Sequence, residues 1–332
     1  MRSNSDAPER VAESVGTWAT TWSSTQIDSV EKGRPPAARI AQESTRRADP
    51  MIADLIYDVG MNDGDDTAYY LHEGYRVVAV EVDPALIEQA RERFDGPIRQ
   101  GRLELVQAAI GPRRETAQFW ICEGKSVWNS FDRQIASREG HTCHAIDVEC
   151  LQFRDLLEQY GVPFYLKVDI EGHDTYCVAD LDQQDLPKYV SLEMGRQLEP
   201  LFMLRDLGYS RFKLIRQNDH SQLAVDPFSF SQLMKQRLRP YPSLYRLGQR
   251  TAGLGRRFSS SAAQRPPQGV NGKHWKFAFG SSGPFGEDTA GSWQTFDEAA
   301  FTWLTYQLGR SCYGQPSLWV WYDLHAVRAE SS

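Results

Sequence analysis

Five ionisable side chains occur within eight positions of the stretch YLKVDIEGHD, residues 165–174: Lys167, Asp169, Glu171, His173 and Asp174. They come at the end of an apolar run that predicts a buried strand. Buried charges are costly unless they are paired, and such clusters are typical of places where pKa values are adjusted for acid–base chemistry. A helix N-terminus would explain one or two of the acids, but not all five groups. The stretch therefore predicts a site of acid–base chemistry.

A second polar turn, DVGMNDG at residues 58–64, follows the apolar run LIY and precedes TAYYL. Glycine adopts backbone conformations that other residues avoid, and it lets another group approach the main chain closely. We therefore expect a ligand at Gly60–Gly64, where a strand ends and a helix begins.

Glu81 follows Gly60 by 21 positions and ends the next apolar run. An acidic residue about 20 positions beyond a glycine turn commonly binds ribose hydroxyls, because a carboxylate accepts two hydrogen bonds from a vicinal diol. This spacing predicts a ligand that contains a nucleoside.

The first turn lacks the G-x-G-x-x-G pattern of dinucleotide sites. Four carboxylates, Asp58, Asp63, Asp65 and Asp66, would repel a pyrophosphate, but they suit the sulfonium and ammonium groups of S-adenosylmethionine. An acidic turn with aspartate caps is the structural alternative, and the offset of Glu81 argues against it. A dehydrogenase is correspondingly disfavoured.

Strands alternate with helices from residue 55 to residue 218. This alternation predicts an α/β fold with a doubly wound, mostly parallel sheet that has helices on both faces. The expected strands are 55–60, 75–83, 102–111, 163–172, 188–194 and 211–218, with added extended stretches at 115–124 and 144–151. A late apolar strand at 317–327 follows a long insertion, and we expect it to return as an antiparallel edge.

The chain divides into four expected parts. Residues 1–49 are a mobile N-terminal extension, and residues 50–217 form a Rossmann-like core that binds S-adenosylmethionine. Residues 218–316 hold a basic stretch and an aromatic, glycine-rich insertion that serves as a lid or substrate region. Residues 317–332 are the final strand and tail.

The motifs DVGMNDG, VEVDP and above all LKVDIEG make residues 52–217 resemble the FkbM-type S-adenosylmethionine-dependent methyltransferases, whose fold is of class I. Asn62 and Gly64 match the Asn and Gly that this family shows after D-x-G. The family usually has a glutamate two residues after the EG pair, where this chain has His173 followed by Asp174. This departure leaves the role of Asp174 open.

The resemblance implies methyl transfer to the oxygen of a hydroxyl on a sugar, a glycan or a natural product. Such transfer needs alignment and a proton acceptor, for which Asp169, Glu171 and His173 are the catalytic candidates. The expected cofactor-binding residues are Asp58, Gly60, Asn62, Gly64, Glu81, Asp83 and Ala109, with Ala108 and Ala109 giving adenine a flat apolar surface.

Three alternatives stay open at this point. Asp169 and Glu193 end neighbouring strands, so a pair of carboxylates there could hold Mg²⁺. Residues 235–265 carry one Lys, seven Arg and no acid, which favours an RNA methyltransferase. A non-catalytic scaffold that binds S-adenosylmethionine is the third.

Composition limits the function classes. A net charge of −7 over 332 residues gives no general reason to expect nucleic acid as a partner. No apolar run approaches the roughly 20 residues of a membrane helix, and the N-terminus has no apolar signal segment. Five cysteines without a CxxC pair argue against a disulfide framework or a zinc site, so we expect a cytoplasmic protein.

Overall fold

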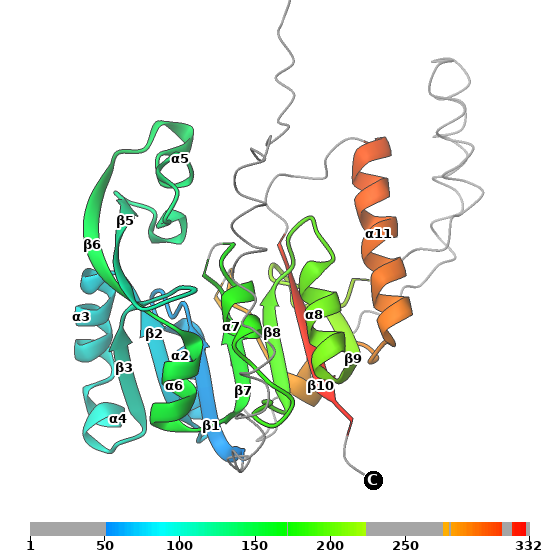
Figure 1. Ribbon diagram of the computed structural model, residues 1–332, viewed down its shortest axis with the longest axis horizontal. Coiled ribbons are helices and arrows are strands. Elements are labelled where there is room, and N and C mark those ends of the chain that lie inside the picture. The colour runs from blue at the N-terminus through cyan, green and yellow to red at the C-terminus, as the bar shows by residue number, and fades with distance from the viewer. Residues whose placement is uncertain (1–50, 171, 224–274, 279, 314–320, 330–332) are drawn as a thin grey trace, which may run out of the picture. The chain divides into compact units, whose positions relative to one another are not determined.

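The computed structural model describes residues 51–170, 172–223, 275–278, 280–313 and 321–329 (Figure 1). The expected N-terminal extension and the basic stretch 235–265 therefore lie outside the described residues. No helix in the described ranges is long and apolar enough to cross a membrane.

A seven-stranded sheet forms the centre of the protein, in the order β3-β2-β1-β7-β8-β10-β9 (Figure 1). Its first five strands in that order are parallel, and β10 is antiparallel to both of its neighbours. The predicted α/β fold with a mostly parallel sheet is confirmed. The strands are β1 (Ile52–Val59), β2 (Arg76–Glu81), β3 (Leu103–Gln107), β7 (Pro163–Val168), β8 (Tyr189–Glu193), β9 (Tyr209–Arg216) and β10 (Tyr322–Arg328).

The expected position of the last strand was wrong. β10 is antiparallel, as predicted, but it lies between β8 and β9, so β9 forms the edge. The reason is burial on both faces: Leu324 and Ala326 are buried on one face, and Asp323 and His325 are buried on the other. A strand buried on both sides belongs in the interior of a sheet.

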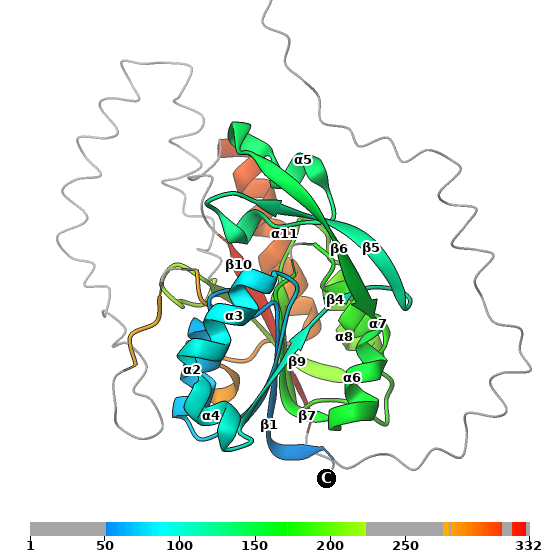
Figure 2. The same cartoon turned by 90° about the vertical axis from the view of Figure 1, so that its left-hand side faces the viewer.

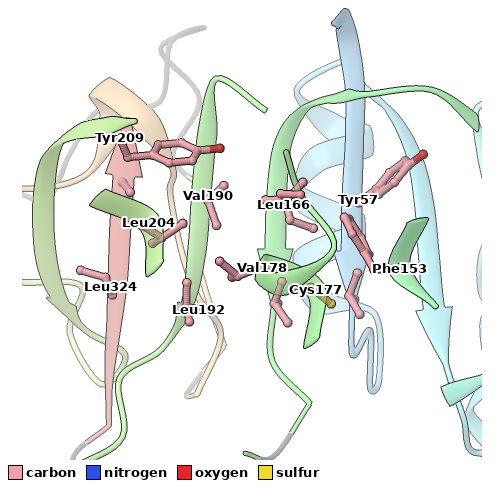
Figure 3. Close-up of a cluster of buried hydrophobic side chains, with 14 of the residues drawn as sticks. Tyr57, Phe153, Leu166, Cys177, Val178, Val190, Leu192, Leu204, Tyr209 and Leu324 are labelled. Atoms are coloured by element: carbon pink, nitrogen blue, oxygen red, sulfur yellow. The ribbon is translucent and has the colours of Figure 1, made fainter. Parts of the chain in front are cut away.

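Helices cover both faces of the sheet (Figure 2). On one face α6, α7, α8 and α11 pack their apolar sides against the strands, and the aliphatic and aromatic side chains of this layer interdigitate (Figure 3). On the other face α2 and α3 cover β1 and β2. The α-helices of the described residues are α2 (Asp65–His72), α3 (Pro84–Arg93), α4 (Asp95–Arg99), α5 (Arg133–Ala136), α6 (Phe153–Tyr160), α7 (Thr175–Ala179), α8 (Glu199–Leu207) and α11 (Phe296–Tyr313).

The aromatic tract near residues 275–293 covers the second face beneath β7 and β8. The Phe285 ring stacks on the Tyr165 ring, with centroids 4.2 Å apart and an angle of 7° between the planes. The buried Lys213 ammonium donates hydrogen bonds to Thr289 O at 3.0 Å and to Thr289 Oγ1 at 2.8 Å. The described part of the predicted insertion is therefore packed against the sheet.

A small second sheet, in the order β4-β6-β5, projects from the core at the carboxyl ends of the strands (Figures 1 and 2). It consists of β4 (Ala109–Ile110), β5 (Glu115–Cys122) and β6 (Cys143–Leu151), where β5 and β6 are antiparallel. We call β5, β6 and the residues between them the arm. The added extended stretches predicted at 115–124 and 144–151 correspond to β5 and β6.

Candidate functional site

The turns after β1, β2 and β7 meet at one edge of the sheet and enclose a cleft with the arm. The cleft has about 810 Å³ of space, open solvent at its mouth included. Its walls come from the three turns and the strand ends before them, from Ala108–Ile110, from the arm, from α3 and from the aromatic tract. They are Gly60, Asn62, Val80, Glu81, Val82, Leu86, Ala108, Ala109, Ile110, Phe119, Ser126, Val127, Asn129, Phe131, Asp169, Ile170, His173 and Gly280.

Gly60 allows the turn after β1 to lie directly against the end of β7. Its φ is +82°, and a Cβ at this position would lie 1.9 Å from the carbonyl oxygen of Asp169. The Lys167 ammonium donates to the Gly60 carbonyl oxygen at 2.7 Å. A side chain at Gly60 would therefore force apart the two polar turns that the sequence singled out.

Asp58 and Lys167 form a buried ion pair beneath the cleft. The Lys167 Nζ lies 2.9 Å from Asp58 Oδ1, and Thr67 Oγ1 donates to Asp58 Oδ2 at 2.6 Å. Burial opposes the Lys167 charge, but the attraction of Asp58, Asp169 and Asp66 outweighs it and raises the pKa of Lys167. Asp58 does not line the cleft, so this pair supports the turn from below.

Glu81 lies in the wall of the cleft, where three main-chain amides hold its carboxylate. Asn62 N donates to Oε2 at 2.8 Å, and Val82 N and Asp83 N donate to Oε1 at 2.9 Å. Burial raises the pKa of Glu81, while these three hydrogen bonds act in the opposite direction. An ionised carboxylate has about four acceptor positions, so Glu81 could still accept from a ligand hydroxyl.

Asp83 and Gly64 do not line the cleft, although the sequence predicted both as cofactor-binding. Asp83 caps α3, because its Oδ1 accepts from Ala85 N at 2.8 Å, and its Oδ2 accepts from Asn129 Nδ2 at 3.1 Å. Gly64 has φ +81° and precedes α2, where a Cβ would lie 2.7 Å from the Phe94 ring. Asp83 and Gly64 therefore position the elements that line the cleft, without lining it themselves.

Asp169 and His173 face the cleft from the end of β7, whereas Glu171 lies outside the described residues. Burial raises the pKa of Asp169, which the Lys167 ammonium partly offsets. Burial lowers the pKa of His173, so its imidazole is neutral at pH 7. The His173 ring is held edge-to-face by Phe131 of the arm, at 5.2 Å between centroids, and is stacked near Tyr176 at 5.5 Å. A neutral, oriented imidazole is suited to accept a proton.

The Mg²⁺ alternative finds no ligand group in the described part of the chain. No three His, Cys, Asp or Glu side chains gather there as metal ligands. Glu193 lines a separate hollow with Asp174 and Arg196, rather than the cleft that Asp169 faces.

Several residues of the site were missed in the sequence. Ser126, Asn129 and Phe131 line the cleft from the loop of the arm, and Ser126 Oγ donates to Asn62 Oδ1 at 2.7 Å. No motif marks these residues, since only the hairpin of the arm brings them to the core.

Two buried aspartates, Asp66 and Asp323, do not line the cleft. The sequence suggested Asp66 as one of four carboxylates near a cationic ligand, whereas Asp323 was not predicted. Asp66 Oδ2 accepts from Ser282 N at 3.0 Å, and burial raises the pKa of Asp66 to about 7. Asp323 Oδ1 accepts from Gln217 Nε2 at 2.8 Å, and burial raises the pKa of Asp323 to about 8. Below pH 7 both carboxyl groups are therefore mostly protonated in the folded protein.

Comparison with models of known protein families identifies a domain in the central part of the chain. Residues 58–211 match the model of a family described as the methyltransferase FkbM domain. A search of curated proteins finds no match.

Several solved structures of methyltransferases are similar to the chain at low identity. A precorrin-6y C5,15-methyltransferase from Geobacter metallireducens is 14% identical, covering 51% of this chain and 71% of its own, with a TM-score of 0.29. A TehB-like SAM-dependent methyltransferase from Corynebacterium glutamicum is 12% identical, covering 57% and 83%, with a TM-score of 0.26. A Haemonchus contortus phosphoethanolamine N-methyltransferase in complex with S-adenosyl-L-methionine is 10% identical, covering 89% and 53%, with a TM-score of 0.30. Likeness at this level carries no information about the substrate.

Proposed function

Because residues 58–211 belong to the FkbM methyltransferase domain family, we propose that this S-adenosylmethionine-dependent methyltransferase acts on oxygen. The proposed acceptor is a hydroxyl group of a sugar, a glycan or a small natural product. We include in the proposal a cytoplasmic location, with which the four free cysteines of the described residues agree.

The observation that carries the proposal is the placement of Glu81, Asp169 and His173 around one cleft. A nucleoside fits this donor set, because the Glu81 carboxylate can accept hydrogen bonds from ribose hydroxyls. Ala108 and Ala109 are buried in the cleft wall, and the small Ala109 side chain leaves room for a flat base. The carboxylates that line the cleft, Glu81 and Asp169, suit a ligand that carries positive charge.

The proposed chemistry is an in-line displacement. S-adenosylmethionine, when bound, supplies an electrophilic methyl group on a sulfonium and leaves as S-adenosylhomocysteine. His173 accepts the proton of the acceptor hydroxyl, since its imidazole is neutral at pH 7. Asp169 accepts a hydrogen bond from a neighbouring hydroxyl of the same substrate and so holds the reacting oxygen in line, a positioning effect that can contribute several kcal/mol. Val127 and Phe131 of the arm line the cleft and present apolar side chains to a bound ligand.

The first test is calorimetric titration with S-adenosylmethionine, S-adenosylhomocysteine and NAD⁺. We expect micromolar binding of the first two and none of NAD⁺. Binding of NAD⁺ alone would refute the assignment of the cofactor.

The second test concerns the acceptor. Panels of sugars, glycans and natural-product alcohols are incubated with ¹³C-methyl-labelled S-adenosylmethionine, and the labelled product is identified by NMR. We expect an O-methyl signal that His173→Gln and Asp169→Asn reduce by at least tenfold, with the His144→Gln variant as control. His144 lies on the arm with an exposed side chain and does not line the cleft. Methyl transfer to nitrogen alone would refute the O-specificity.

The RNA alternative depends on residues 235–265, which lie outside the described residues. No described feature favours it, so we propose no second function.

A further inference from the structure

Two cysteines face each other across the two strands of the arm. Cys122 is the last residue of β5, Cys143 is the first residue of β6, and the antiparallel register pairs them directly. Side chains of directly opposed residues lie on the same face of a sheet. Both cysteines are free thiols in the structure.

Residues that face each other in an antiparallel sheet form either hydrogen-bonded or non-hydrogen-bonded pairs, and the main-chain hydrogen bonds show which kind Cys122 and Cys143 form. Glu123 N donates to Thr142 O at 2.9 Å, so the neighbouring pair is the hydrogen-bonded one. Cys122 N donates away from β6, to Asn129 Oδ1 at 2.8 Å. Cys122 and Cys143 therefore form a non-hydrogen-bonded pair, in which Cα atoms typically lie about 4.5 Å apart. This spacing is within the roughly 4.4–6.8 Å that a disulfide spans.

Cys122 and Cys143 flank the loop that lines the cleft, and we call this pair of positions the neck of the loop. Residues 123–142 are the loop of the arm, which begins after Cys122 at the end of β5 and ends before Cys143 at the start of β6. Within this loop Ser126 donates to Asn62, and Phe131 packs on His173. A third contact involves Cys122 directly. Asn129 Oδ1 accepts a hydrogen bond from Cys122 N, and Asn129 Nδ2 donates one to Asp83 Oδ2.

The two thiols differ in access to solvent. Cys122 is 3% exposed, whereas Cys143 is half-buried. An oxidant therefore reaches Cys143 first, and Cys122 is placed as the resolving thiol. Cytosolic disulfides, where they occur, are usually transient and redox-sensing, which agrees with free thiols in the resting protein.

We propose that Cys122 and Cys143 are a redox-responsive pair whose disulfide closes the neck of the cleft loop. Hydrogen peroxide is the oxidant: the Cys143 sulfur attacks one of its oxygens, the O–O bond breaks, and Cys143 becomes a sulfenic acid with release of one water. The Cys122 sulfur then attacks the Cys143 sulfur, and the hydroxyl leaves as a second water. Two thiol hydrogens and one peroxide are consumed, and a thiol reductant restores the pair.

The first experiment tests formation of the bond. The full chain is treated with hydrogen peroxide, digested without reduction and mapped by mass spectrometry. We expect a linked peptide pair containing Cys122 and Cys143 that dithiothreitol separates. The Cys143→Ser variant should lack it, and Cys150→Ser should keep it. Cys150 lies on the same strand opposite Glu115. Absence of the link, or pairing of either cysteine with another one at equal yield, would overturn the proposal.

The second experiment tests the effect on the loop. Hydrogen exchange of residues 123–142 is compared in the reduced and oxidised full chain, and we expect at least threefold slower exchange after oxidation. Unchanged exchange in a protein that carries the link would overturn the role of the neck.

A third measurement rests on the proposed function. Dissociation of S-adenosylhomocysteine should slow at least threefold on oxidation, and not in Cys143→Ser. Unchanged dissociation would overturn control of the cleft by the pair. If the reduced protein does not bind S-adenosylhomocysteine, the proposed function fails, while the link and the exchange still decide this proposal.

Discussion

Replacement of Gly60 by alanine tests whether the turn after β1 depends on close contact with β7. The residue has φ +82°, and left-handed backbone costs an L-residue about 1–2 kcal/mol. The new Cβ would lie 1.9 Å from the Asp169 carbonyl oxygen, so the turn must move away by about 1 Å. That movement breaks the 2.7 Å hydrogen bond from Lys167 to Gly60, at a cost of about 1.5–3 kcal/mol. Together we expect a loss of about 2.5–5 kcal/mol in the free energy of unfolding.

Gly74→Ala is the matched control. Gly74 also has positive φ, at +95°, but a Cβ there meets nothing within 4 Å. Replacement of Gly74 should lower the free energy of unfolding only by the cost of the left-handed backbone conformation, about 1–2 kcal/mol. Urea unfolding measures both variants, with an unchanged m-value as the check on two-state behaviour.

Cofactor binding separates the two glycines further. Because the Gly60 turn lines the cleft, Gly60→Ala should abolish measurable binding of S-adenosylmethionine, while Gly74→Ala should bind within threefold of the wild type. Equal destabilisation by the two variants, together with retained binding in Gly60→Ala, would refute the reasoning about the turn.

Three further predictions follow from the polar groups around the cleft. Lys167→Met leaves the buried Asp58 carboxylate without its cation and should cost about 3–5 kcal/mol in urea unfolding. Asp323 has a folded pKa of about 8, raised by burial, so between pH 4 and pH 8 the folded state binds more protons than the unfolded state, and stability falls as pH rises. Asp323→Asn removes the contribution of this group, and its stability relative to the wild type should improve by about 4 kcal/mol from pH 5 to pH 8.5, because about three pH units lie between pH 5 and the folded pKa. Ser126→Ala removes the hydrogen bond to Asn62 and should weaken S-adenosylmethionine binding three- to tenfold in calorimetry.

Each of these predictions has an outcome that contradicts it. The double variant Lys167→Met with Asp58→Asn should recover at least half of the lost stability, and no recovery would mean that the unpaired charge is not the cause. A pH-independent difference between Asp323→Asn and wild type would show that Asp323 does not titrate in this range. Unchanged affinity in Ser126→Ala would remove the arm from the binding site.

The local pattern of the sequence was sufficient to predict the two polar turns and the acidic residue at the end of β2. Gly60, Asn62, Glu81, Ala109, Asp169 and His173 do line one cleft. The carboxyl ends of neighbouring parallel strands must meet at the same edge of a sheet, so the alternation of strands and helices was enough to bring these residues together.

Local pattern was not sufficient to separate residues that face the cleft from those that support it. Asp58 and Asp83 have the same side chain and lie in the same two motifs as the cleft residues. One is paired with Lys167 beneath the turn, and the other caps α3 and holds Asn129. Which way a carboxylate points depends on partners that are distant in sequence.

The sequence by itself determined the α/β class, the family and which strand ends carry the predicted residues that line the cleft, because periodicity and turn residues act over a few positions. Only the tertiary structure decided that β10 lies between β8 and β9, that the arm covers the cleft, and that Cys122 opposes Cys143. The two cysteines form no sequence motif, because twenty residues separate them. Only the register of β5 and β6 brings them opposite each other. Register and strand order are long-range properties, set by the burial of whole faces rather than by neighbouring residues.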